Sequence, residues 1–257
     1  MSDFDRNIAT ARGGYGADRA LAIDAGLRAY MIRVYNLMAG GIAFTGIAAW
    51  LTYQAAGGDA IRRVGGGLVG TTAFGDMVLG GFTPILLMLV TLGLVFFLSF
   101  RIDRLQPTTA FAVFTLYAGL MGVALTSIFV VYTGVSISRV FFITAGTFGA
   151  MSLYGYTTKR DLSGFGSFLF MGLIGLILAS LVNIWLASSM MQFVISAVGV
   201  LIFVGLTAYD TQQIKEMYDV NDDGTASGRK AIMGALRLYL DFLNLFIMLL
   251  QLFGDRR

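Results

Sequence analysis

Residues 80–100, GGFTPILLMLVTLGLVFFLSF, form an apolar run without a charged side chain, and this run decides the class of the fold. A helix rises about 1.5 Å per residue, so about 20 such residues cross the roughly 30 Å hydrocarbon core of a bilayer. The run is too long and too uniformly apolar for a barrel strand, in which apolar and polar residues alternate over about ten residues. It therefore predicts a transmembrane helix.

Comparable runs recur along the chain, and together they predict an all-α integral membrane protein with seven transmembrane helices. Composition agrees, because 57% of the 257 residues are hydrophobic and only 13% are charged, against about 25% charged in a soluble domain. We expect a seven-helix domain at 29–254 behind a polar tail at 1–28, which lacks the apolar core of a cleavable signal. The predicted spans are 30–53, 80–100, 109–132, 138–157, 165–187, 191–217 and 232–253.

The distribution of basic residues predicts the orientation of these spans. With the N-terminus in the cytoplasm, twelve of the 18 Lys and Arg residues fall on the cytoplasmic side and five on the outer side. Cytoplasmic loops are enriched in these residues, so this orientation is favoured. The C-terminus then lies outside, unless the seventh run re-enters instead of crossing. The long connection at 54–79 is expected to form a mobile outer loop.

Two aspartates lie inside the apolar last third, Asp210 in GLTAYDTQQIK (205–215) and Asp241 in LYLDFLNLF (238–246). A carboxylate at membrane depth costs roughly 2.5–3.5 kcal/mol, so a chain that keeps two is expected to use them. The last two spans are joined by a short polar loop and run antiparallel. Both aspartates then lie roughly 10–14 Å from the same surface. We predict that they form a carboxyl pair on adjacent helices.

Polar residues near the two aspartates could modulate the pair. Thr207 shares a helix face with Asp210. The last span carries one polar stripe, made of Arg237, Asp241, Asn244 and Gln251. A stripe that faced lipid would be costly, so we expect it to face the bundle interior. The competing interpretation is a hydrogen-bonded network that only fixes helix packing, at about 0.6 kcal/mol per bond. We favour that interpretation for Asn244 and Gln251.

The predicted pair suits proton sensing and transient cation binding. Two carboxyl groups in contact cannot both ionise cheaply, so they titrate together. The chain has no His and no Cys, which leaves Asp210 and Asp241 as the candidates for a proton sensor near neutral pH. Ionised carboxylates also suit Ca²⁺, which prefers oxygen ligands. We expect transient Ca²⁺ contacts at the pair, with no resident cofactor and no nucleic-acid partner.

Other chemistry finds little support in the sequence. It contains no HExxH, GxSxG or P-loop motif. An intramembrane aspartyl protease needs two membrane aspartates, but Asp241 lies in YLD without the glycines expected of a second protease motif, so no enzyme is predicted. Residues 219–230, DVNDDGTASGRK, match the first half of an EF-hand loop, yet the twelfth position is Lys230. A polar turn between helices is the favoured interpretation of that loop.

The chain resembles bacterial members of the Bax inhibitor-1 family, also called the transmembrane Bax inhibitor motif family, over residues 28–254. The two aspartate motifs carry the resemblance together with FFITAGTFGAMSLYGYTTKRDLS at 141–163. It implies seven helices with the last enclosed by the other six, in the cell inner membrane. It also implies a pH-sensitive Ca²⁺ leak. The alternative is an interaction protein that regulates a membrane-bound AAA protease or another integral partner.

The resemblance also implies roles for individual residues. The family's aspartate pair corresponds to Asp210 and Asp241, and its latch arginine to Arg101, with Arg104 as the alternative. Arg101 is expected to bridge the ionised pair and hold the second helix over the pore until protonation releases it. Arg237 is a departure, because a small residue often precedes LYLDF in relatives. An arginine there would favour the ionised pair and lower the switching pH.

Overall fold

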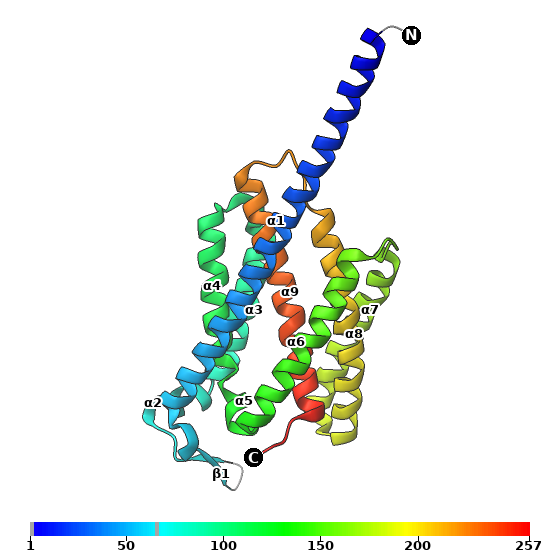
Figure 1. Cartoon of the computed structure of the whole chain (residues 1–257). Coiled ribbons are helices and arrows are strands. Elements are labelled where there is room, and N and C mark those ends of the chain that lie inside the picture. Colours follow the sequence, from blue (N-terminus) through cyan, green and yellow to red (C-terminus); the bar gives the residue numbers. More distant parts are fainter. Residues whose placement is uncertain (1–2, 65–66) are drawn as a thin grey trace.

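The computed structural model describes the backbone of residues 3–64 and 67–257 and the side chains of residues 24–62, 64 and 67–257. In this part of the chain the strands β1 (Arg62–Val64) and β2 (Gly67–Val69) form a short antiparallel hairpin. The other elements, shown in Figure 1, are α1 (Asp3–Ala56), η1 (Gly58–Ala60), α2 (Ala73–Leu79), α3 (Thr83–Arg101), η2 (Ile102–Arg104), α4 (Pro107–Ala124), α5 (Thr126–Val131), α6 (Gly134–Thr157), α7 (Ser163–Leu186), α8 (Ser189–Glu216) and α9 (Gly224–Phe253).

Seven helical segments of the described chain are long and apolar enough to cross a membrane. Five are single helices or parts of one, whereas α3 continues into η2 and α4 into α5 to complete the other two. The predicted all-α class with seven spans is confirmed. α9 starts at the end of the bundle where α8 finishes and runs to the opposite end (Figure 1), so it traverses the bundle and does not re-enter.

The last helix is the most buried of the seven segments. It packs chiefly on α8, α1, α6 and α4 and also contacts η2, while α3 and α7 pack mainly on α4 and α8, so enclosure by all six helices is not confirmed. Tyr239 illustrates the packing. Its hydroxyl group lies 2.7 Å from Oγ1 of Thr45 on α1, and its ring meets Phe114 and Tyr117 of α4 edge-on. One α9 side chain thus fixes two neighbouring helices.

Close backbone contacts bring α6 against α8. A Cβ atom added at Gly155 of α6 would overlap the carbonyl oxygen of Ala208 on α8. Small residues at such crossings let membrane helices approach closely, which increases van der Waals contact where no hydrophobic driving force acts between helices. The crossing lies two residues from Asp210, so it fixes the part of α8 that carries this aspartate.

α9 begins eight residues before the predicted span 232–253. The side chain of Asp223 caps the helix by accepting a hydrogen bond of 2.6 Å from the amide of Ala226. Asp222 forms an ion pair of 2.6 Å with Lys230 on the first turns. An apolar run predicts only the part of a helix that lies in the hydrocarbon core, so it does not reveal the polar, capped first turns of α9. The loop that resembles an EF-hand is a capped helix-to-helix turn.

The connection at 54–79, expected to be an outer loop, contains regular elements. Its described residues include the end of α1, η1, the two strands of the hairpin and α2. The amide of Thr72 donates to the carbonyl oxygen of Ala56 at 2.9 Å, which returns the segment to the end of α1. Thr72 also caps α2 by accepting a hydrogen bond from the amide of Gly75 at 3.1 Å. Backbone pairing and caps thus give regular structure to parts of a segment in which the glycines predicted a loop.

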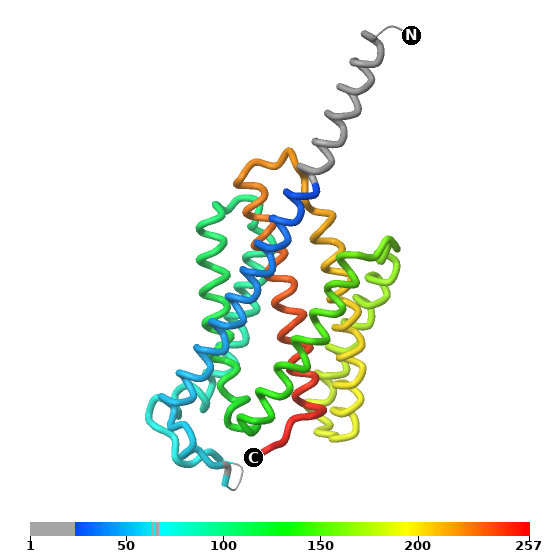
Figure 2. The backbone as a smooth tube through the Cα atoms, in the orientation of Figure 1, coloured from blue at the N-terminus to red at the C-terminus, as the bar shows by residue number. Residues whose placement is uncertain are grey.

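The C-terminal residues 254–257 lie at the end of the bundle that carries the connection at 54–79 (Figure 2). The amide of Arg257 donates to the carbonyl oxygen of Val131 at 2.9 Å, and its guanidinium group donates to Tyr53 Oη at 2.9 Å and to Asp59 Oδ1 at 3.1 Å. These bonds join the ends of α1, α5 and α9. The hydrogen bonds from Arg257 and then Tyr53 lower the pKa of Asp59 below its ordinary value.

Replacing Gly155 by Val should destabilise the bundle by about 3 kcal/mol, the upper end of overpacking costs, because the new side chain meets backbone that cannot turn away. Thermal unfolding in detergent, followed by circular dichroism, measures the effect. Gly149→Val is the matched control, since a Cβ at Gly149 of the same helix meets nothing within 4 Å. Equal losses in both variants would contradict a close contact at Gly155.

Asp59→Asn should speed amide hydrogen exchange at the C-terminus at pH 7. Because the pKa of Asp59 is lowered in the folded protein, its contact with Arg257 is fully present above the ordinary value and is lost as pH falls through the folded-state pKa. The difference from the native protein should therefore shrink at acid pH. Asp103→Asn, at the other end of the bundle, is the control. A difference that persists in acid would refute the assignment.

Candidate functional site

Asp210 of α8 and Asp241 of α9 meet inside the bundle. Asp241 is 5% exposed and the side chain of Asp210 is 18% exposed. The two carboxyl groups lie on helices that pack closely on each other, near enough for the charge of one to act on the other. Because an ionised carboxylate can only accept hydrogen bonds, a bond between them requires one carboxyl group to carry a proton. Oδ2 of Asp241 is buried and receives no hydrogen bond from a described donor. The structure thus brings the predicted pair together.

Arg237 supplies positive charge beside the pair. Its NH1 atom lies 4.0 Å from Oδ1 of Asp210, and its side chain is 39% exposed. It precedes Asp241 by about one turn of α9, yet the ion pair that it forms reaches across to α8. The guanidinium group is therefore positioned to respond to the charge that Asp210 carries.

The predicted modulators Thr207 and Asn244 do not bond to the aspartates. The hydroxyl group of Thr207 donates to the carbonyl oxygen of Phe203 at 2.7 Å. Nδ2 of the Asn244 side chain donates to the carbonyl oxygen of Leu240 at 2.8 Å. Both side chains satisfy their donors on their own helices. These bonds offset the desolvation cost of placing the two polar side chains in the interior.

A chain of hydroxyl groups leads away from the residue after Asp210. Oγ1 of Thr211 lies 2.9 Å from Oγ of Ser152 on α6, which lies 2.6 Å from Oη of Tyr35 on α1. Tyr35 and Ser152 both line a groove of about 730 Å³ between α1 and α6. The sequence does not predict this chain, because single hydroxyl residues in apolar runs give no periodic signal.

The profile described as "Inhibitor of apoptosis-promoting Bax1" matches residues 27–257, nearly the whole chain. The chain belongs to the Bax inhibitor-1 family. A similar protein, "Inner membrane protein YbhL" of Escherichia coli strain K12, is 48% identical over 235 residues, which are 91% of this chain and 94% of that protein. "Uncharacterized protein RP147" of Rickettsia prowazekii is 42% identical, and a protein of Caulobacter vibrioides 43%, each over the full length of both chains.

The Bax inhibitor-1 resemblance implied a latch at Arg101 or Arg104, and the structure places both apart from the pair. Arg101 ends α3 and Arg104 ends η2, and both are exposed. Among the described residues neither forms an ion pair with Asp210 or Asp241, whereas Arg237 pairs with Asp210. For Arg101 the cause is the packing order, since α3 lies mainly on α4, whereas η2, which carries Arg104, does contact α9. Depth along a span does not reveal which helix is adjacent.

A second polar group of this Bax inhibitor-1 protein lies at the other end of α9. Nε2 of Gln192 donates to Oε1 of Gln251 at 2.7 Å, and Oγ of Ser196 donates to the same oxygen at 2.8 Å. Nδ2 of Asn183 donates to Oε1 of Gln192 at 3.1 Å. These amides line a cavity of about 420 Å³ between α7, α8 and α9. Gln251 thus belongs to a polar network, as its place on the stripe suggested.

Between the amide network and the aspartate pair lies an apolar contact. A Cβ atom added at Gly199 of α8 would lie 2.9 Å from Sδ of Met248 on α9, so the Met248 side chain fills the space between the two helices. Asp241 and Gln251 are ten residues apart, about 15 Å along the helix axis. The polar interior is therefore divided into two levels with a methionine between them.

Proposed function

We propose that the protein is a pH-sensitive calcium leak in a bacterial inner membrane, gated at the contact between Asp210 and Asp241. The observation that carries this proposal is two carboxyl groups in the bundle interior on adjacent spanning helices, with Arg237 beside Asp210. The N-terminus is proposed to lie in the cytoplasm, which the distribution of Lys and Arg supports. The name of the related "Inner membrane protein YbhL" supports the choice of membrane.

The gate is proposed to close through charge on the pair. A carboxylic acid that donates to a carboxylate forms a charge-assisted bond, roughly twice as strong as a neutral one. In that state the negative charge also attracts Arg237. A second proton removes the charge, so both attractions weaken together. The contact between α8 and α9 is then free to loosen as the pH falls.

Calcium is proposed as cargo and not as a resident ion. Ca²⁺ takes about six to eight oxygen ligands, and Asp210 and Asp241 supply carboxylate oxygens, with water completing the shell. Within the described residues no group of three or more acidic, His or Cys side chains could hold a metal. Two carboxylates favour brief contact over tight binding, which suits an ion in transit.

Regulation of a membrane-bound AAA protease is the alternative drawn from the family resemblance. It depends on the predicted tail at 1–28, and the side chains of residues 1–23 lie outside the described part of the chain. The absence of enzyme activity likewise stays a prediction. The geometry that is described, a carboxyl pair between spanning helices, favours the leak.

The double variant Asp210→Asn, Asp241→Asn should flatten the pH dependence of Ca²⁺ flux into liposomes that contain the purified protein. Two amides carry no charge, so this variant resembles the doubly protonated pair, whereas either single variant keeps one carboxyl group that can still ionise. If the lost attraction contributes about 1.4 kcal/mol to the closed state, flux at pH 7 rises about tenfold. A Ca²⁺-sensitive dye inside the liposomes measures the flux, with Asp103→Asn as the control. A pH profile like that of the native protein in the double variant would refute the gate.

Arg237→Gln should move the midpoint of the pH profile to higher pH, by about one unit if the guanidinium group favours the ionised pair by about 1.4 kcal/mol. The sign follows from charge, since removing a neighbouring cation makes protonation easier. Arg101→Gln is the matched variant and should leave the midpoint unchanged. The opposite pattern, a shift with Arg101→Gln alone, would assign the latch to Arg101.

A further inference from the structure

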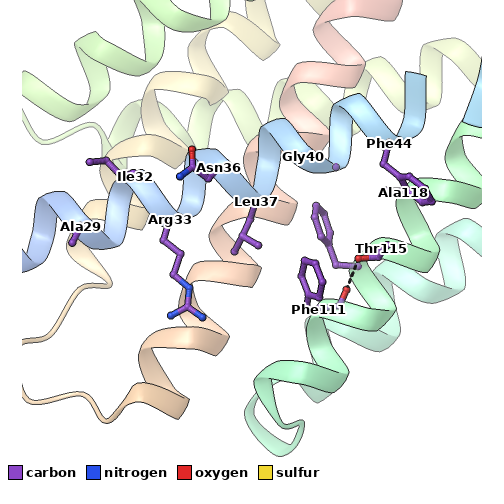
Figure 3. Close-up of a pocket in the computed structure, with 12 residues that line it drawn as sticks. Ala29, Ile32, Arg33, Asn36, Leu37, Gly40, Phe44, Phe111, Thr115 and Ala118 are labelled. Carbon is purple, nitrogen blue, oxygen red and sulfur yellow. Dashed lines mark hydrogen bonds between the residues drawn. The ribbon is translucent and has the colours of Figure 1, made fainter. Parts of the chain in front are cut away.

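An apolar groove of about 590 Å³ lies between α1 and α4 (Figure 3). Its walls include Ile32, Phe44 and Phe111, which are 48%, 43% and 48% exposed. Gly40 and Ala118 also line it, and their small side chains leave the groove open. The volume falls in the range of about 300–1,000 Å³ that is usual for small-ligand sites. The chemistry of its walls suits a hydrocarbon chain.

Arg33 lies at one end of this groove, beside the first turns of α4 and α9 (Figure 3). A Cβ atom added at Gly228 of α9 would be 3.7 Å from NH2 of Arg33 and 3.2 Å from the ring of Pro107 on α4. No carboxylate of the residues with described side chains forms an ion pair with Arg33. Its charge is therefore available to an anion.

The start of α4 adds to the positive potential at this end. The side chain of its N-cap residue Gln106 makes no capping bond. The first amide groups of the helix therefore point outward without a hydrogen bond to the N-cap side chain. The helix dipole places partial positive charge at the same point. Nε of Arg229 donates to the carbonyl oxygen of Leu105 at 2.6 Å, which brings a second arginine next to the α4 start. An anion at Arg33 would meet all of these groups.

The position of Arg33 along α1 matches a membrane boundary. It lies twenty residues before Tyr53, about 30 Å along the axis and close to the thickness of the hydrocarbon core. Tyr53 bonds to Arg257 and Asp59 at the opposite end of the bundle. From Arg33 to Phe44 the distance is about 16 Å, roughly the depth of one leaflet.

We propose that the groove binds an anionic phospholipid of the leaflet on the N-terminal side of the bundle. The phosphate contacts Arg33 and the first turn of α4, and one acyl chain lies over Gly40 between Phe44 and Phe111. Basic pockets between membrane helices on this side are suited to anionic head groups. A partner helix would need about 20 residues to cross the bilayer, whereas this groove reaches across one leaflet. The site is independent of the proposed leak.

Native mass spectrometry of the full-length protein in detergent tests the site, with phosphatidylglycerol and phosphatidylcholine of identical acyl chains as probes. Phosphatidylglycerol should bind about fivefold more tightly, as expected for one basic residue at the membrane surface, and Arg33→Gln should remove that preference. Gly40→Leu should weaken the binding of both lipids, because a Cβ at Gly40 points into open space and the leucine side chain would fill the groove.

Matched variants serve as controls. Arg160→Gln removes an exposed charge outside the groove, and Gly46→Leu adds the same bulk on α1 where a Cβ also meets nothing within 4 Å. Both should bind the lipids as the native protein does. If Gly40→Leu does not fold, Phe111→Ala removes one wall instead. Equal binding of the two lipids, a preference that survives Arg33→Gln, or native binding by the groove variant would overturn the proposal.

Discussion

The contact between Asp210 and Asp241 constrains the rest of the bundle. Carboxyl groups at membrane depth are tolerated only when they are neutralised or paired in the protein interior. α8 and α9 must therefore stay adjacent, and other helices must cover the pair. α1, α4 and α6 provide that cover by packing on α9. The central position of α9 is thus a requirement of the acidic residue that it carries.

Close helix contact makes this arrangement possible. Gly155 lets the backbone of α6 reach α8, and Gly199 makes room for Met248 between α8 and α9. Without a hydrophobic driving force between helices in lipid, such contacts supply the van der Waals packing that holds the bundle together. Polar groups in the interior then bond within their own helix, as Thr207 does, or to a neighbouring helix, as Ser152 does.

The sequence predicted the features that have a strong local signal. Seven apolar runs predicted the spans, and two acidic residues in such runs predicted the pair. It could not predict which arginine stands beside the pair, because depth along a helix is encoded locally and helix adjacency is not. Arg237 pairs with Asp210 while Arg101 lies on a helix that packs elsewhere. The bonds of the Arg257 side chain could not be predicted for the same reason, since they join residues about 200 positions apart.

The two ends of the bundle are held by different forces, and this difference bears on how the proposed gate could move. At one end backbone and side-chain bonds of 2.9–3.1 Å tie Arg257 to α1, α5 and η1. Toward the other end, Arg237 of α9 forms an ion pair of 4.0 Å with Asp210 of α8, and Nε of Arg229 donates to the carbonyl oxygen of Leu105 at 2.6 Å. A change in the charge of Asp210 acts on the ion pair with Arg237 and leaves the bonds of Arg257 intact above the folded-state pKa of Asp59. Under the proposed leak, α8 and α9 would therefore move apart at the level of the two aspartates while the C-terminal end of α9 stays fixed.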